Sequence, residues 1–174
     1  MTLIVNLYGG PGSGKSTTAA SAFSLLKGRG RKVELVTEAA KDLTYEKSPL
    51  LGNNLHILSE QYRRLSRLRG KVDVVLNDSP LLLSLAYVGY PIVGPHFTGL
   101  VAQLYRSFNN LDIFVKRVKP YAPYGRNQSE DEAKELDKTI ADILSLHASH
   151  SIVTVLGDQD AGAVVASLAQ ARCT

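Results

Sequence analysis

Near its amino end the chain reads Gly9-Gly10-Pro11-Gly12-Ser13-Gly14-Lys15-Ser16, which fits G-x-x-x-x-G-K-[ST] at every fixed position. Loops of this pattern, called P-loops, hold phosphate groups because their glycines let successive backbone N–H groups point toward one centre. The apolar run 3–8 predicts a buried strand before the loop, and residues 15–27 predict a helix after it. This order of strand, loop and helix favours a P-loop over an incidental glycine-rich turn.

The P-loop and the first turn of the following helix supply the residues that we expect to hold a nucleotide. Lys15 should reach the β- and γ-phosphates, and the Ser16 hydroxyl should ligate Mg²⁺. The positive end of the helix dipole faces the same point. We therefore expect Mg²⁺ together with ATP, or with another nucleoside triphosphate in its place. The expected nucleotide-binding residues are Gly10, Pro11, Gly12, Ser13, Gly14, Lys15, Ser16 and Thr17.

Length and composition predict one domain in a reducing compartment. The chain has 174 residues, of which 44% are hydrophobic, so a single core over residues 1–174 is expected. Cys173 is the only cysteine and cannot close an internal disulfide, which favours the cytoplasm. The first strand leaves no room for a signal peptide, and no apolar run approaches the ~18 residues of a membrane span. The net charge of +4 allows an anionic partner larger than a nucleotide.

Strands and helices alternate along the chain after the P-loop. This alternation predicts an α/β fold in three layers, with a five-stranded parallel sheet in the order 2-3-1-4-5 and right-handed crossovers. The later strands are expected at 32–37, 71–78, 111–115 and 151–156. The later helices are expected at 39–43, 55–68, 81–90, 97–108, 129–147 and 160–172, with a loop at 44–53.

Glu38 follows the second predicted strand, so it should lie at the carboxyl edge of the sheet, where ligands of open α/β sheets bind. A carboxylate there can accept the proton of a substrate hydroxyl or hold a magnesium-bound water. Glu38 also precedes the short helix 39–43, whose dipole it would stabilise. The sequence favours the catalytic and the structural role of Glu38 equally.

Asp78 ends an apolar strand, the Walker B pattern, and should meet the magnesium ion or its water shell. The same side chain would also suit the cap of a helix that begins near Pro80. Ser79 follows Asp78 at the position where motor-type ATPases carry a water-activating carboxylate. Its absence favours transfer to a hydroxyl over hydrolysis, with either Glu38 or Asp78 as the proton acceptor.

Two segments are rich in cations. The helix 55–68 and its end carry four arginines within seven residues, and we select Gln61 and Arg64 as substrate contacts, although such a face is often merely solvated. The irregular segment 117–128 is a candidate lid that closes over ATP and neutralises charge. An ordinary basic surface loop is the alternative. The lid residues selected are Arg117, Lys119 and Arg126.

Aromatic residues are candidates to bind the base of a nucleotide-like substrate. Side chains between 87 and 97 either stack on a base or belong to the core. These residues are Tyr87, Tyr90, His96 and Phe97.

A nucleotide-hydrolysing switch is the competing class of function. A GTPase of this class should carry the motif Asn-Lys-x-Asp, and the nearest match, residues 109–112, lacks the lysine.

With the P-loop, Asp78-Ser79-Pro80 and residues 117–137 in view, the chain resembles the small P-loop kinases of the thymidylate-kinase type. It is more specifically similar to phage proteins related to nicotinamide-riboside kinase domains, and most like the phage 5-hydroxymethyluracil DNA kinases. The run Lys-Arg-Val-Lys-Pro-Tyr-Ala-Pro-Tyr-Gly-Arg-Asn-Gln-Ser-Glu at 116–130 looks like their lid.

This resemblance implies ATP-dependent transfer of the γ-phosphoryl group to the hydroxymethyl group of 5-hydroxymethyluracil in phage DNA, during thymidine hypermodification in the host cytoplasm. The acceptor would then be a flipped base or a single-stranded stretch, because a P-loop site is too narrow for a duplex. Free nucleosides or nucleoside monophosphates are the alternative acceptors. The assigned catalytic residues are Lys15, Glu38, Asp78, Arg117 and Arg126, with Ser16 and Asp78 at the metal.

Overall fold

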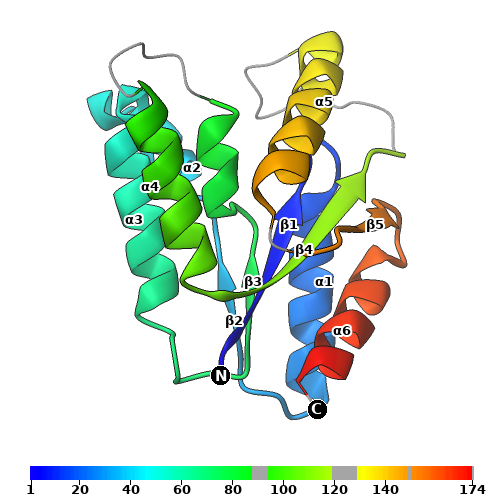
Figure 1. Ribbon diagram of the computed structural model, residues 1–174. Coiled ribbons are helices and arrows are strands. Elements are labelled where there is room, and N and C mark those ends of the chain that lie inside the picture. Colours follow the sequence, from blue (N-terminus) through cyan, green and yellow to red (C-terminus); the bar gives the residue numbers. More distant parts are fainter. Residues whose placement is uncertain (88–93, 119–128, 149, 174) are drawn as a thin grey trace.

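The centre of the molecule is a parallel sheet, with the strand order β2-β3-β1-β4-β5 (Figure 1). This computed structural model describes residues 1–87, 94–118, 129–148 and 150–173. The strands are β1 (Leu3–Tyr8), β2 (Val33–Val36), β3 (Val74–Asn77), β4 (Asn109–Lys116) and β5 (Val153–Leu156). The predicted α/β class and strand order are confirmed.

Helices cover both faces of the sheet, which gives the three layers seen in Figure 1. The α-helices are α1 (Lys15–Gly28), α2 (Ala39–Tyr45), α3 (Asn54–Ser66), α4 (Gly94–Arg106), α5 (Glu130–His147) and α6 (Ala161–Arg172). Two short 3₁₀ helices, η1 (Pro49–Gly52) and η2 (Leu81–Leu85), complete the described elements. Within the described ranges, no helix combines the length and apolarity that crossing a membrane requires.

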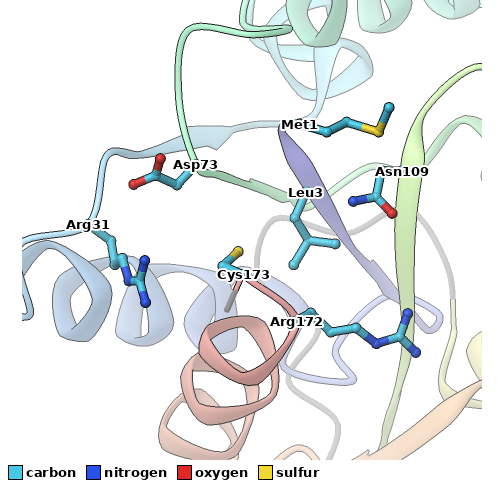
Figure 2. Close-up of a pocket in the computed structure, with 7 residues that line it drawn as sticks. All are labelled: Met1, Leu3, Arg31, Asp73, Asn109, Arg172 and Cys173. Atoms are coloured by element: carbon cyan, nitrogen blue, oxygen red, sulfur yellow. The ribbon is translucent and has the colours of Figure 1, made fainter.

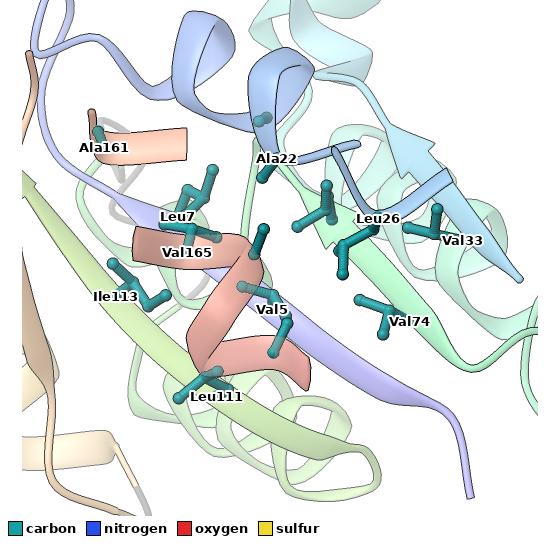
Figure 3. Close-up of a cluster of buried hydrophobic side chains, with 14 of the residues drawn as sticks. Val5, Leu7, Ala22, Leu26, Val33, Val74, Leu111, Ile113, Ala161 and Val165 are labelled. Atoms are coloured by element: carbon teal, nitrogen blue, oxygen red, sulfur yellow. The ribbon is translucent and has the colours of Figure 1, made fainter. Parts of the chain in front are cut away.

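Alternation along the strands divides the core between the two faces. Leu3, Val5 and Leu7 of β1 point toward α1 and α6, where they join an apolar cluster with side chains from all of the other strands (Figure 3). Ile4 and Tyr8 point the other way, toward α3, α4, α5 and η2. Because both faces are covered, the strands read as apolar runs, which is why the sequence located them.

The face toward α3 and α4 also buries a seam of polar side chains, which the sequence did not predict. Asn77 donates to Asn6 Oδ1 at 2.9 Å, and Asn6 donates to Asn110 and Asp112, each at 3.0 Å. The Tyr105 hydroxyl donates to the other oxygen of Asp112. Buried polar groups are tolerated when they satisfy one another, and this seam links β3, β1, β4 and α4.

Several elements differ from the sequence prediction in type or in extent. The described part of the expected helix 81–90 is only η2, closed by i to i+3 bonds such as Leu83 N to Pro80 O at 2.9 Å. The expected loop 44–53 contains η1, which begins with a proline and whose Ser48 side chain accepts from Leu50 N. Strand β4 begins at Asn109 because that residue and Asn110 pair with β1.

Candidate functional site

The P-loop joins β1 to α1 at the carboxyl edge of the sheet, and its backbone requires glycine. Gly9 has φ of 139°, and a Cβ there would lie 2.6 Å from Ser13 Oγ and 2.8 Å from Val115 O. Gly14 forms the N-cap of α1 with φ of 102°. Side chains are disfavoured at both positions, so the backbone can adopt the loop conformation whose amides bind phosphate in P-loops.

Lys15 lies folded against the P-loop. Its Nζ donates to Gly9 O at 2.6 Å and to Gly10 O at 3.3 Å. Burial lowers the pKa of Lys15, and the negative charges of Asp78, Glu38 and Asp137 partly offset that effect. Carbonyl oxygens are weaker partners for an ammonium than phosphate is, so Lys15 is placed to exchange them for a polyphosphate.

Ser16 and Asp78 form the pair that suits a magnesium ion. The Ser16 hydroxyl donates to Asp78 Oδ2 at 2.6 Å, while Asp78 Oδ1 is buried and has no hydrogen-bond partner among the described residues. Burial raises the pKa of Asp78, and the Ser16 hydrogen bond and Lys15 act against that rise. A buried acceptor without a donor is what a magnesium ion or its water would satisfy, so these residues fit the metal.

Ser16 and Asp78 do not belong to a larger cluster of metal-binding side chains among the described residues. Within the described part of the chain, no three acidic, cysteine or histidine side chains cluster in a way that would hold a metal ion. Mg²⁺ commonly binds through few protein oxygens and takes its other ligands from phosphate and water. The pair of Ser16 and Asp78 therefore suits magnesium bound together with a nucleotide.

Glu38 lies beside Lys15 and Asp78 at the start of α2. Glu38 is the N-cap residue of α2, and its side chain makes no capping hydrogen bond, so its stabilisation of that helix is limited to the interaction of its charge with the helix dipole. Burial raises the pKa of Glu38; Lys15 lowers it and Asp78 raises it further. A carboxylate with a raised pKa is a stronger proton acceptor than an exposed one, which suits work on a hydroxyl group.

Gln61 is buried and Arg64 is partly buried, and both make contacts within the protein. Gln61 is 3% exposed, and its amide bonds to Ala39 N at 3.1 Å and to Asn77 Oδ1 at 3.1 Å. The Arg64 side chain is 18% exposed and forms ion pairs with Asp42 at 2.6 Å and Glu60 at 3.0 Å. These contacts show that the polar face of α3 turns toward α2, which the sequence could not show, and the substrate contacts expected at both residues stay a prediction.

Arg117 also differs from its predicted place on an exposed lid. Its side chain is 10% exposed; Nη1 donates to Pro11 O at 2.7 Å, and Nη2 pairs with Asp137 Oδ2 at 3.0 Å. Arg117 therefore braces the P-loop from the end of β4. Lys119 and Arg126 lie outside the described residues, so the lid at 119–128 stays a prediction.

Two residues at the P-loop escaped the sequence analysis. Asp137 of α5 accepts the Gly10 N–H with Oδ1, in addition to its pair with Arg117. Gly157, after β5, packs so tightly that a Cβ would lie 2.1 Å from Ser13 O. The sequence does carry a signal for Asp137. This residue lies on the same face of α5 as Ala133 and Ile140, which are buried, and a charged side chain on a buried face needs a partner.

The aromatic residues divide between core and site. Phe97 is 3% exposed and belongs to the core, whereas Tyr87 is 45% exposed. Burial, with Glu38 and Asp137 as nearby negative charges, raises the pKa of Tyr87 to about 12. Tyr90 lies outside the described residues.

A shallow cavity of about 140 Å³ lies at the opposite edge of the sheet, beside the amino ends of β1 and β4 (Figure 2). It is lined by Met1, Leu3, Arg31, Asp73, Asn109, Arg172 and Cys173. None of the P-loop residues lines it, so this cavity is separate from the candidate site.

The comparisons with known proteins agree with this geometry. A protein-family model described as an AAA domain matches residues 4–159, from β1 to just beyond Gly157. The chain belongs to the AAA domain family. The match includes every part of the site, and this AAA domain is therefore a P-loop domain of the nucleotide-binding kind. No curated protein matches the chain.

Proposed function

We propose that this protein is an ATP-dependent kinase that transfers a phosphoryl group to a hydroxyl of a nucleotide-like acceptor. The observation that carries the proposal is the position of Glu38, which stands beside Lys15 and Asp78 with no capping bond of its own. Ser79 and Pro80, rather than a second carboxylate, follow Asp78. The site thus holds a proton acceptor suited to an alcohol.

In the proposed reaction the acceptor oxygen forms a bond to the γ-phosphorus of ATP, and the bond from that phosphorus to the β,γ-bridging oxygen breaks. ADP leaves, and the hydroxyl proton passes to the Glu38 carboxylate. Lys15 and the P-loop amides hold the phosphates and offset the negative charge of the transferring group. Mg²⁺, held by Ser16 and Asp78 when bound, would supply further charge neutralisation.

The acceptor proposed first is the hydroxymethyl group of 5-hydroxymethyluracil in DNA, on the resemblance to phage kinases. Free nucleosides and nucleoside monophosphates are the second choice. The assay offers ATP labelled at the γ-phosphate with hydroxymethyluracil DNA, nucleosides and monophosphates in separate reactions. Label on DNA supports the first acceptor, and label on the small molecules alone refutes it.

Lys15→Ala is the control for all of these reactions. We expect it to abolish transfer while the circular dichroism spectrum stays that of the wild type, because the hydrogen bonds of the Lys15 side chain to described residues are to the carbonyls of Gly9 and Gly10 in its own loop. Full activity of Lys15→Ala would remove the proposed mechanism.

A nucleotide-hydrolysing ATPase is the second candidate, because the matching family model is described as an AAA domain. Phosphate release from ATP without any acceptor, at a rate that acceptors do not raise, would favour it. A kinase should instead release little phosphate alone and should transfer label stoichiometrically when its acceptor is present.

A further inference from the structure

The side-chain amide of Gln61 bonds to the backbone on both sides of Glu38. Its Oε1 accepts the N–H of Ala39, the residue after Glu38, at 3.1 Å. Its Nε2 lies 3.4 Å from the carbonyl oxygen of Thr37, the residue before Glu38. A neighbouring β-strand also accepts an N–H and donates to a C=O of the strand beside it. The Gln61 amide makes the same two kinds of bond, so it fixes the backbone of residues 37–39, which carries the Glu38 side chain.

The same amide ties this backbone to the segment that carries Asp78. Gln61 Nε2 also donates to Asn77 Oδ1 at 3.1 Å, and Asn77 donates to Asn6 at 2.9 Å. Asn77 directly precedes Asp78. Gln61 therefore joins the chain segments of the two carboxylates to each other and to the buried seam across the sheet.

Arg64, one turn further along α3, holds the segment after Glu38. Its guanidinium pairs with Asp42 Oδ2 at 2.6 Å and approaches Thr37 O at 3.4 Å. The Arg64 guanidinium also pairs with Glu60 of the same helix, at 3.0 Å. α3 thus contacts the backbone before Glu38, the backbone after it, and the side chain of Asp42.

External support of this kind is needed because α2 is too small to fix Glu38 by its own packing. The helix has seven residues, of which only Ala39 and Leu43 are buried. A short helix with so little apolar contact has low local stability unless neighbouring elements hold it. A proton acceptor, in contrast, must stay within hydrogen-bond reach of the acceptor hydroxyl.

We propose that Gln61 is a positioning residue, which holds Glu38 at the distance from Asp78 and Lys15 that phosphoryl transfer requires. Gln61 does not touch the acceptor or the nucleotide. This inference rests on the proposed function, in which Glu38 takes the proton. Gln61 therefore affects the rate of phosphoryl transfer and not the binding of substrate.

The test compares Gln61→Met with Gln103→Met, which makes the same change at an exposed position on α4. Gln61→Met should lower kcat about 10- to 100-fold, since a displacement near 1 Å can cost a factor of this size. The KM for ATP should stay within about twofold, because the P-loop is untouched. Gln103→Met should match the wild type in both constants.

A double-mutant cycle shows whether Gln61 acts through Glu38. When Glu38→Gln has already removed the proton acceptor, adding Gln61→Met should lower kcat by less than about twofold more. If the two losses multiply instead, Gln61 acts independently of Glu38 and the proposal is overturned. Gln61→Glu, which keeps the acceptor for Ala39 N–H and loses the donor, serves if Gln61→Met unfolds.

Amide hydrogen exchange provides a readout that does not depend on activity. The Ala39 N–H should exchange about 10-fold faster or more in Gln61→Met, because it loses its partner, while amides of α6 keep the wild-type rate. Unchanged exchange at Ala39 would overturn the positioning role. Absence of transfer by the wild type would instead refute the proposed kinase, so the two failures are distinguishable.

Discussion

Replacing Asp137 with asparagine should destabilise the protein markedly, although Asp137 lies far from the P-loop in sequence. The Asp137 carboxylate accepts the Gly10 N–H and pairs with Arg117 at 3.0 Å, and the side chains of the pair are 19% and 10% exposed. Asparagine keeps an acceptor for the amide but removes the charge that faces the guanidinium.

The size of this loss follows from the contacts. A hydrogen bond between charged groups contributes about 1.5–3 kcal/mol, and removing one partner leaves the other charge poorly compensated in a low dielectric. We therefore expect Asp137→Asn to lower the free energy of unfolding by about 1.5–3 kcal/mol. For a chain of this size, that loss lowers Tm by roughly 3–10 °C.

The assay is urea and thermal unfolding followed by circular dichroism, with Asp142→Asn as the matched control. Asp142 is exposed on the same helix, so its substitution should change stability by less than about 0.5 kcal/mol. A cycle with Arg117→Met should give a coupling energy of about 1–3 kcal/mol. Equal stability of the two asparagine variants would refute the argument that α5 braces the P-loop.

Three further predictions follow from other contacts. Glu38→Gln should lower kcat by about 10²- to 10⁴-fold and raise Tm at neutral pH. Burial raises the folded-state pKa of Glu38, so its ionised form costs stability above that pKa, and the Tm difference between the variant and the wild type should shrink as the pH falls through that pKa. Gly157→Ala puts a carbon 2.1 Å from a P-loop carbonyl oxygen and should lower the free energy of unfolding by about 1–3 kcal/mol in urea melts, whereas Gly28→Ala, with nothing within 4 Å, should be neutral or better. Arg64→Met should lower kcat more than Arg63→Met, because Arg63 pairs only with Glu60 in its own helix; equal losses would contradict the contact with α2.

Local sequence patterns were enough to predict the fold and the nucleotide side of the site. The P-loop motif specifies its own backbone, because the positive φ angles at Gly9 and Gly14 favour glycine. The strands were visible as apolar runs because helices cover both faces of the sheet. Glu38 and Asp78 were found because each follows a strand, and the ends of parallel strands meet at one edge.

The roles of Gln61, Arg64, Arg117 and Asp137 depended on tertiary structure alone. Apart from Glu60, which pairs with Arg64 within α3, their partners lie 16 to 127 residues away in sequence, as in Gln61 with Asn77 and Gly10 with Asp137. A polar or charged side chain in a sequence reads as exposed, since burial without a partner is costly, and only packing of the helices on the sheet brings the partners into reach. The sequence by itself therefore determined which residues are candidates to bind phosphate, because the P-loop motif is local, while the tertiary structure decided which polar residues hold the P-loop and its neighbours in place.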